Sequence, residues 1–345
     1  MRALLTVQRA GATVGLAGES IEVRFGRDVL ASKPLAEVAE LHLYGTIELT
    51  AAARTRLLRA GVDTLFLSPA GRLQGALRTR VDRGGQRRLA QLHALADEAR
   101  TLELARLFVE GKLANQRSLC LRMAREHRGP QAVAAAVALG RLQARAPTDL
   151  DTLRGVEGQG AAVYFRALGE AIRNPLFSFT KRTRRPPTDP VNACLSFGYT
   201  LVLARVEAAL LRAGLEPCLG ALHAADHGKP ALALDVMEPL RPMVDRLVLR
   251  LINRRQLEPA DFVHPDVDPS TLGAPPTGEV PAQPAVYLGE RGRAIFLPAL
   301  QALWRQPVQG RQGRSTLQAH LDAFAAALGR RFEGADGELD PPRID

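Results

Sequence analysis

The sequence predicts an α+β protein with a small N-terminal β-rich domain followed by a large α-helical domain. Apolar and polar residues alternate in the N-terminal part of the chain, as they do in strands with one buried face. Beyond Arg78, apolar residues recur every three or four positions, as they do on one face of a helix. We therefore expect a β-rich domain at 1–77, a linker at 78–88 and an α-helical domain at 89–345.

The expected β-rich domain carries one short helix. Residues 21–25 alternate in the manner of a strand. Thr50 can begin a helix over 51–60, because its hydroxyl can accept a hydrogen bond from a free amide of the first turn. Gly61 can end that helix, since glycine adopts a left-handed conformation at little cost. Residues 62–67 then form a buried strand.

The helical domain is interrupted once and ends in a tail. Residues 78–88 are basic and hold two adjacent glycines, so they form a linker or, as an alternative, the first turn of the next helix. Proline, glycine, aspartate and threonine are dense over 264–284, which prevents regular structure. We expect a mobile loop there, with ordering on DNA or a partner as a hypothesis. A helical pattern resumes at 316–331, and 333–345 is expected to fray.

The composition is that of a folded, basic protein. Of the 345 residues, 46% are hydrophobic and 24% are charged, which excludes a disordered tail or a fibre. The formal net charge of +10 favours a polyanionic partner such as nucleic acid. Only four lysines occur, so arginine supplies nearly all the positive charge, and a high genomic GC content could produce that bias without any function.

The sequence also bears on the location of the protein. No apolar run approaches the roughly 18 residues that a membrane-spanning helix needs, and the N-terminus lacks a secretory apolar core. The three cysteines are odd in number and far apart, which fits reduced thiols. We therefore expect a cytoplasmic protein with no membrane partner.

Side chains that can bind a metal gather in three short segments. Glu157 and His223 lie beside glycines, and Asp235 and Glu238 lie three residues apart. On a helix the two acids would share a face, with β-carbons about 5 to 6 Å apart, and could hold a cation. Two carboxylates and one imidazole suit Mg²⁺ or Mn²⁺. The opposite face would be buried by an apolar stripe of Val236, Leu240, Val244, Leu247, Val248 and Leu251.

Each of these residues also has an ordinary structural explanation. Glu157 alone is more often a solvated carboxylate near a helix start, and His223 alone is more often a satisfied, half-buried histidine. Pro239 and Pro242 indicate that the helix either begins near the acidic pair or bends there. The basic run 181–187 is a solvated connector or a segment that presents arginines to a partner.

In combination and order, these segments resemble the CRISPR-associated protein one family of DNA integrases. The segments that match the family's pattern are 43–45, 65–68, 110–117, 155–165, 184–199, 214–223 and 233–242. The resemblance covers nearly the whole chain up to about residue 262. It implies an N-terminal β-sandwich-like domain joined to an α-helical catalytic domain.

The resemblance also implies roles for single residues. Glu157, His223 and Glu238 would be ligands of a divalent metal, Mg²⁺ or Mn²⁺, with Asp235 a nearby acid that the active site needs. Contacts to the DNA backbone are implied for a second set: Lys229, Arg241, Arg184 and Arg185.

The activity implied is the insertion of short double-stranded DNA fragments into a CRISPR array. The 3′-hydroxyl of a fragment attacks a phosphodiester at the repeat by transesterification, so no nucleoside triphosphate is needed, and the sequence holds no phosphate-binding loop of the Gly-x-x-x-x-Gly-Lys-Ser/Thr type. The resemblance implies homodimers bridged by CRISPR-associated protein two.

Three other functions remain open at the level of sequence. The same metal ligands could direct water, which would give a structure-specific nuclease of DNA repair. A transposon-type integrase is a close variant of the CRISPR reading. The third function is that of a non-catalytic DNA-binding assembly subunit, in which the acidic residues have only a structural role.

Overall fold

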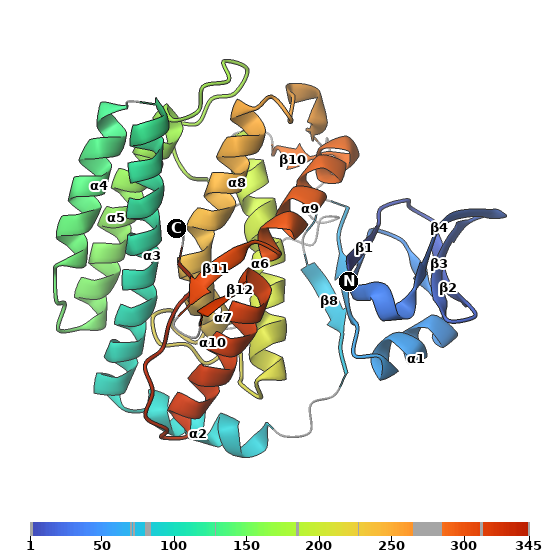
Figure 1. Cartoon of the computed structure of the whole chain (residues 1–345), viewed down its shortest axis with the longest axis horizontal. Coiled ribbons are helices and arrows are strands. Elements are labelled where there is room, and N and C mark those ends of the chain that lie inside the picture. Colours follow the sequence, from blue (N-terminus) through green and yellow to red (C-terminus); the bar gives the residue numbers. More distant parts are fainter. Residues whose placement is uncertain are drawn as a thin grey trace. The chain divides into compact units, whose positions relative to one another are not determined.

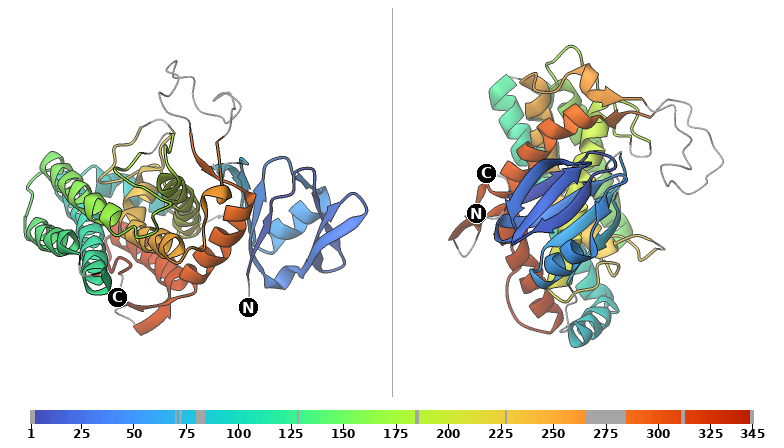
Figure 2. Two further views of the ribbon diagram at one scale, coloured as in Figure 1. Left: turned by 90° about the horizontal axis from the view of Figure 1, so that it is seen from above. Right: turned by 90° about the vertical axis from the view of Figure 1, so that its right-hand side faces the viewer.

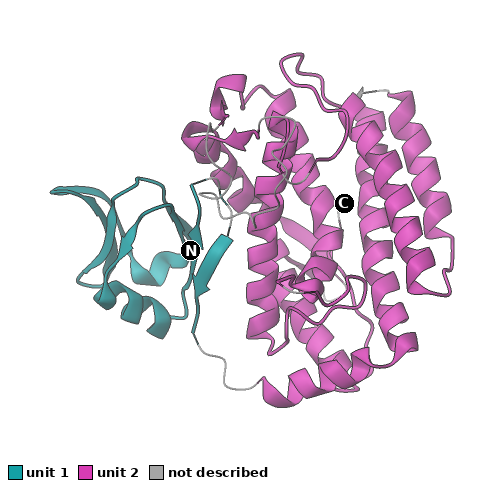
Figure 3. Cartoon of the chain, turned by 180° about the vertical axis from the view of Figure 1, so that it is seen from behind, with its two compact units in different colours: residues 1–80, 266–280 teal, residues 81–265, 281–345 magenta. Residues whose placement is uncertain are grey.

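The structure is a computed structural model, and the chain divides into two compact units (Figure 3). The residues that it describes are 3–69, 71, 73–79, 84–127, 129–183, 186–226, 228–264, 285–310 and 313–343. The first unit comprises residues 1–80 and 266–280, and the second comprises 81–265 and 281–345. Segment 266–280 lies outside the described residues, as does all of the predicted loop 264–284 except His264.

The first unit is built from two four-stranded sheets. In the first sheet the order is β1 (Ala3–Val7), β5 (Val38–Tyr44), β7 (Asp63–Leu67) and β8 (Leu73–Leu77). Strands β1, β5 and β7 are parallel to one another, and β8 is antiparallel to β7. In the second sheet the order is β4 (Asp28–Pro34), β3 (Ser20–Phe25), β2 (Thr13–Ala17) and β6 (Glu48–Leu49). A short 3₁₀ helix, η1 (Leu35–Glu37), links β4 to β5.

One helix, α1 (Ala51–Arg59), contacts both sheets of this unit through β2 and β7 (Figure 2). The Thr50 hydroxyl accepts a hydrogen bond from the amide of Ala53 at 3.3 Å, and Gly61 has a φ of 66°. The helix therefore begins and ends as its sequence predicts. Apolar side chains from both sheets and from α1 form one core, which confirms the β-rich, sandwich-like domain.

The second unit is mainly helical, which confirms the predicted fold class (Figure 1). Its helices are α2 (Gly85–Leu95), α3 (Glu98–His127), α4 (Pro130–Gln143), α5 (Leu150–Glu170), α6 (Pro190–Arg212), α7 (Ala231–Met237), α8 (Arg241–Asn253), α9 (Glu290–Trp304) and α10 (Leu317–Phe332). Short elements complete it: the 3₁₀ helices η2 (Glu238–Leu240) and η3 (Pro259–Asp261), the strand pair β9 (Phe262–Val263) and β10 (Tyr287–Leu288), and the hairpin of β11 (Pro307–Gly310) and β12 (Gly313–Thr316).

Three long helices, α3, α4 and α5, pack side by side, as Figure 1 and the left view of Figure 2 show. Aspartates begin two of the helices in this unit. The carboxylate of Asp149 accepts the amide of Thr152 at 2.8 Å before α5, and that of Asp189 accepts the amide of Asn192 at 2.8 Å before α6. These caps fix where the helices start, and so where the side chains of the site fall along them.

Helix α6 is the exception to the sequence argument about membranes. It is long and apolar enough to span a membrane, with a window of mean hydropathy 1.5, but 67% of that window is buried inside the unit. Its neighbours α7, α8 and α10 cover it. Core packing therefore accounts for its apolar character.

Two boundaries differ from those expected. Helix α2 begins at Gly85, so the last residues of the predicted linker 78–88 form the first turn of that helix, which was the alternative interpretation. The prediction that 333–345 frays is wrong at its end, because Pro341 and Pro342 are buried. Asn115 donates a hydrogen bond to the carbonyl of Pro342 at 2.8 Å, and this tertiary contact has no signal in the local sequence.

Candidate active site

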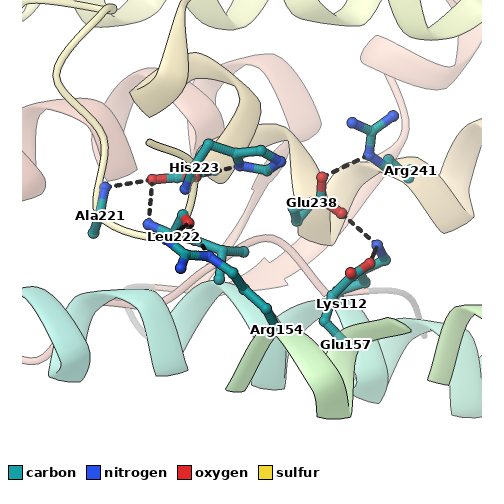
Figure 4. A network of polar contacts seen from close by, with 9 residues as sticks. Lys112, Arg154, Glu157, Ala221, Leu222, His223, Glu238 and Arg241 are labelled. Carbon is teal, nitrogen blue, oxygen red and sulfur yellow. Dashed lines mark hydrogen bonds and ion pairs between the residues drawn. The ribbon is translucent and has the colours of Figure 1, made fainter. Parts of the chain in front are cut away.

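A buried lysine joins the two acidic side chains that the sequence singled out (Figure 4). Lys112 lies in the middle of α3, with its side chain 6% exposed. Its ammonium forms an ion pair with Glu157 of α5 and lies 2.6 Å from Oε2 of Glu238. Three segments that are far apart in the sequence thus meet at one cation.

Glu238 is held from two sides. Nε of Arg241, one helical turn further on, donates a hydrogen bond to Oε1 of Glu238 at 2.9 Å, and Lys112 faces Oε2. Burial alone would raise the pKa of Glu238, but the positive charges of Arg241 and Lys112 outweigh it and lower that pKa to about 2. Glu238 is therefore a carboxylate at neutral pH, although it is 3% exposed.

Asp235 has a different task, which is to hold the loop that carries His223. Its side chain is fully buried, and its Oδ2 accepts the amides of Ala221 and Leu222 at 2.7 and 3.0 Å. Its Oδ1 accepts the amide of His223 at 3.0 Å and lies 2.6 Å from Nδ1 of the same residue. Because an ionised carboxylate can only accept, the proton of this contact is on Nδ1 of His223.

Glycine is required where this loop begins. A β-carbon on Gly220 would lie 2.6 Å from the backbone carbonyl carbon of Ala231 and 2.8 Å from Oδ2 of Asp235. On the far side of the loop, Arg154 donates two hydrogen bonds to the carbonyl of Leu222, at 3.1 and 2.9 Å. The loop therefore fits around the carboxylate and is tied to α5.

In the structure, the two carboxylates of the acidic pair have different partners. Helix α7 ends at Met237, and the chain continues as the 3₁₀ turn η2, which contains Pro239. Asp235 is satisfied by the loop amides, whereas Glu238 faces Lys112 and Arg241. The apolar stripe is as predicted, with all six residues buried.

The side chains present fit a divalent metal in their chemistry. Oε2 of Glu238 is buried without a hydrogen bond of normal geometry, although Lys112 balances its charge. Nδ1 of His223 is hydrogen-bonded to a carboxylate, as one ring nitrogen of a metal-binding histidine usually is. Within the described ranges, however, no three His, Cys, Asp or Glu side chains already converge as a metal cluster. Glu157 and Glu238 are thus assembled around an ammonium ion, while His223 is held separately by Asp235.

The residues expected to contact DNA fall in different places. Arg241 has a side chain only 14% exposed, and its guanidinium carbon lies 4.8 Å from the ring centroid of Tyr199. Lys229 is 56% exposed and forms an ion pair with Asp226. Arg184 and Arg185 lie outside the described residues.

Two members of a buried polar network behind Arg241, Tyr164 and Asp245, escaped the sequence analysis. Tyr164 and Tyr199 both donate hydrogen bonds to the carboxylate of Asp245, the first at 2.7 Å. Arg182 also contacts this network, with its guanidinium carbon 5.3 Å from the ring centroid of Tyr199. Desolvation raises the pKa of both tyrosines, so they are neutral donors at neutral pH.

Lys112 also escaped the sequence analysis, although it lies in a segment that carries the family resemblance. A signal for it was present, because one of only four lysines falls within a helical pattern among apolar residues. No sequence feature named its partners.

The fold and the site together define a class of protein. It is an α+β chain whose helical unit pairs a buried lysine with two carboxylates and holds a nearby imidazole on a buried aspartate (Figure 4). Carboxylates and an imidazole are donors suited to a hard divalent metal. Comparison with known proteins narrows this class. The family model for CRISPR associated protein Cas1 matches residues 5–272, and the chain belongs to that family.

Named relatives agree with the assignment. CRISPR-associated endonuclease Cas1 1 of Thermus thermophilus is 40% identical over 291 residues, which cover 84% of this chain and 82% of the relative. CRISPR-associated endonuclease Cas1 1 of Chlorobaculum tepidum is 35% identical over 356 residues, which cover 99% of this chain and 97% of the relative. The family of this chain is therefore one of CRISPR-associated endonucleases.

Solved structures share the fold. A casposase bound to integration product matches with a TM-score of 0.82 at 21% identity, covering 99% of this chain and 93% of the casposase chain. A Cas6-RT-Cas1–Cas2 complex matches with a TM-score of 0.78 at 24% identity, covering 96% of this chain and 35% of that chain. At these identities the match establishes the fold alone.

Proposed function

We propose that this chain is a metal-dependent DNA integrase and endonuclease of CRISPR adaptation. It would join the 3′-hydroxyl ends of short double-stranded DNA fragments to the CRISPR repeat. The observation that carries the proposal is the pairing of Glu157 and Glu238 through Lys112, with the His223–Asp235 pair drawn in the same polar network (Figure 4), in a member of the Cas1 family.

In the proposed reaction, one phosphodiester replaces another. The 3′-hydroxyl oxygen of the fragment forms a bond to a phosphorus of the repeat strand, and the bond from that phosphorus to its former 3′ oxygen breaks. The attacking hydroxyl loses its proton to solvent, and the leaving oxygen gains one. The number of phosphodiesters is unchanged, so the reaction needs no nucleoside triphosphate.

Glu157, Glu238 and His223 would hold Mg²⁺ or Mn²⁺. When bound, the metal would lower the pKa of the attacking hydroxyl and neutralise charge on the phosphate oxygens. Arg241 keeps Glu238 ionised and in place, and Asp235 keeps the proton of His223 on Nδ1, which leaves Nε2 as the donor atom.

DNA would be held mainly through its phosphates, because the chain is basic and its arginines and lysines are suited to backbone contacts. Lys229 is exposed beside the His223 loop and is proposed as one such contact, together with Arg241, Arg184 and Arg185. We further propose a homodimer that assembles with Cas2. Support comes from the likeness to the chain of a Cas6-RT-Cas1–Cas2 complex and to a casposase bound to integration product.

The test mixes the purified chain, with and without Cas2, with a short DNA duplex and a supercoiled plasmid that carries a repeat. Fragments with free and with blocked 3′ ends are compared in Mn²⁺, Mg²⁺ or chelator. We expect joining that needs both a free 3′-hydroxyl and a metal. Nicking or branched-DNA cutting that is indifferent to the 3′ end would instead identify a nuclease, and binding without strand chemistry would identify an assembly subunit.

A matched pair of variants locates the chemistry. Glu157→Gln removes a proposed ligand from α5, while Glu170→Gln changes an exposed acid at the end of the same helix. Joining should be lost in the first variant and kept in the second. Full joining by a folded Glu157→Gln variant would contradict the assigned site.

A further inference from the structure

The C-terminal tail returns to the active site after α10 ends at Phe332. Residues 333–338 are exposed, but Pro341 and Pro342 are buried. Two adjacent buried prolines at the end of an exposed segment indicate a specific docking position rather than a frayed terminus.

Asn115 of α3 joins this tail to the segment that carries Glu238. Its side chain is 1% exposed, and its Nδ2 donates one hydrogen bond to the carbonyl of Pro239 at 2.7 Å and another to the carbonyl of Pro342 at 2.8 Å. An amide NH₂ has two hydrogens, so both are used. A single side chain thus bonds the residue after Glu238 and the tail together.

Close packing supports the same contact. A β-carbon on Gly111 would lie 3.0 Å from Cγ of Pro239 and 3.4 Å from Cγ of Pro341, so α3 has no side chain where the two prolines approach it. A second anchor lies on α10, where Nε2 of His320 is 3.0 Å from the carbonyl of Asp340. The tail is therefore fixed at two points.

The tail docks on the same part of α3 that holds Glu238. Gly111, Lys112 and Asn115 lie within about one turn of α3. Lys112 holds the carboxylate of Glu238, and Asn115 holds the carbonyl of the next residue. Helix α3 therefore holds Glu238 and Pro239, and the tail shares the second of these contacts, because Asn115 also bonds Pro342.

We propose that residues 339–342 are a positioning strap of the active site. By sharing Asn115 with Pro239, the strap fixes the η2 turn and so the direction of the Glu238 carboxylate. This inference rests on the proposed function for its effect on joining, but its effect on η2 does not depend on that function.

The experiment compares the full chain with a chain that ends at Gly337 and with the full-length variant Asn115→Leu, which keeps the size of the side chain and removes both hydrogen bonds. Asp336→Ala, in the exposed part of the tail, is the matched control. Mn²⁺ affinity is measured by calorimetry, amide exchange of 236–244 by mass spectrometry, DNA affinity by anisotropy, and joining on the plasmid.

We expect both altered chains to bind Mn²⁺ about tenfold more weakly, as is typical when a residue behind a metal ligand is removed. Exchange of 236–244 should rise while that of α4 and the DNA affinity stay unchanged, and joining should fall. Asp336→Ala should match the unaltered chain in every measurement.

Unchanged Mn²⁺ affinity and unchanged exchange in a folded Asn115→Leu chain would overturn the strap. A second outcome separates the two proposals. If amide exchange and Mn²⁺ affinity change as expected but the unaltered protein joins no DNA, the strap is supported and the proposed function is refuted. If the shortened chain does not fold, Asn115→Leu alone decides the question.

Discussion

The carboxylate of Asp235 lies 2.6 Å from Nδ1 of His223 and also accepts the backbone amide of that residue at 3.0 Å. The acid therefore sets both the position of the histidine and the ring nitrogen that carries the proton. Burial raises the pKa of Asp235, while the imidazole and the loop amides act in the opposite direction. The loop hydrogen bonds are the contacts that balance the burial of this group.

Asp235→Asn should destabilise the protein and weaken the site. An asparagine can accept with one atom only, so its NH₂ would face either the loop amides or the imidazole, and a buried donor would lose its partner. We expect a loss of about 2 to 4 kcal/mol in the free energy of unfolding and at least a tenfold weaker binding of Mn²⁺. Urea unfolding and calorimetry measure the two effects.

The control for this substitution is Asp336→Asn, which changes an exposed carboxylate in the C-terminal tail. It should leave both quantities unchanged. An Asp235→Asn chain as stable as the unaltered protein would contradict the role of this carboxylate in holding the loop.

Lys112→Met should leave two carboxylates facing each other without their shared cation. Breaking a buried ion pair in this way typically costs about 3 to 5 kcal/mol, and a divalent metal could replace the lost charge. We expect the melting temperature in chelator to fall, and the rise on adding Mn²⁺ to be larger than in the unaltered protein. Differential scanning calorimetry with and without Mn²⁺ measures both.

The exposed Lys181→Met is the companion variant, since it removes the same charge from the surface. It should leave the melting temperature and its response to Mn²⁺ unchanged. A Lys112→Met chain that responds to Mn²⁺ no more than this companion would show that the ammonium does not stand where a metal binds.

Both ends of α1 could be predicted from the sequence, because the cap at Thr50 and the left-handed Gly61 depend only on neighbours along the chain. The acids and the histidine could be found for a related reason, since they lie in short segments with unusual neighbours. Lys112 could not be assigned a partner, because Glu157 is 45 positions away and Glu238 is further still. Only the packing of α3 against α5 and η2 brings them together.

The break after α7 and the docked tail show a second limit of the sequence. Proline at 239 indicated a start or a bend, but the direction in which Asp235 points depends on loop amides from 221–223. Pro341 and Pro342 resemble a disordered end when only their neighbours are considered. Their burial depends on Asn115, which lies in another part of the chain.

Gly220→Ala should strain the His223 loop. The added β-carbon would lie 2.6 Å from a backbone carbon of Ala231, which cannot move as a flexible side chain would. We expect a loss of about 1 to 3 kcal/mol in the free energy of unfolding. Gly158→Ala is the matched control, because its β-carbon would meet nothing within 4 Å in the middle of α5. That variant should gain about 0.5 to 1 kcal/mol, since alanine favours a helix over glycine. Equal stability of the two variants would contradict the close packing at Gly220.

Asp245 should make the stability of the protein depend on pH in the mildly acidic range. Burial raises its pKa from 3.8 to about 6, although hydrogen bonds from Tyr199 and Tyr164 and the charges of Arg182 and Arg241 oppose the rise. The folded state therefore holds this proton more tightly than the unfolded state. Its contribution to stability falls as the pH rises from about 4 to about 6, and is constant above.

Asp245→Asn removes this proton while keeping an acceptor for the tyrosines. The free energy of unfolding of the unaltered protein, minus that of the variant, should fall by up to about 3 kcal/mol between pH 4 and pH 7. Groups that both chains share cancel in this difference, so urea unfolding of the two chains at a series of pH values isolates Asp245. A difference that stays flat or rises with pH would mean that the carboxyl is already ionised at pH 4, held so by Arg182 and Arg241.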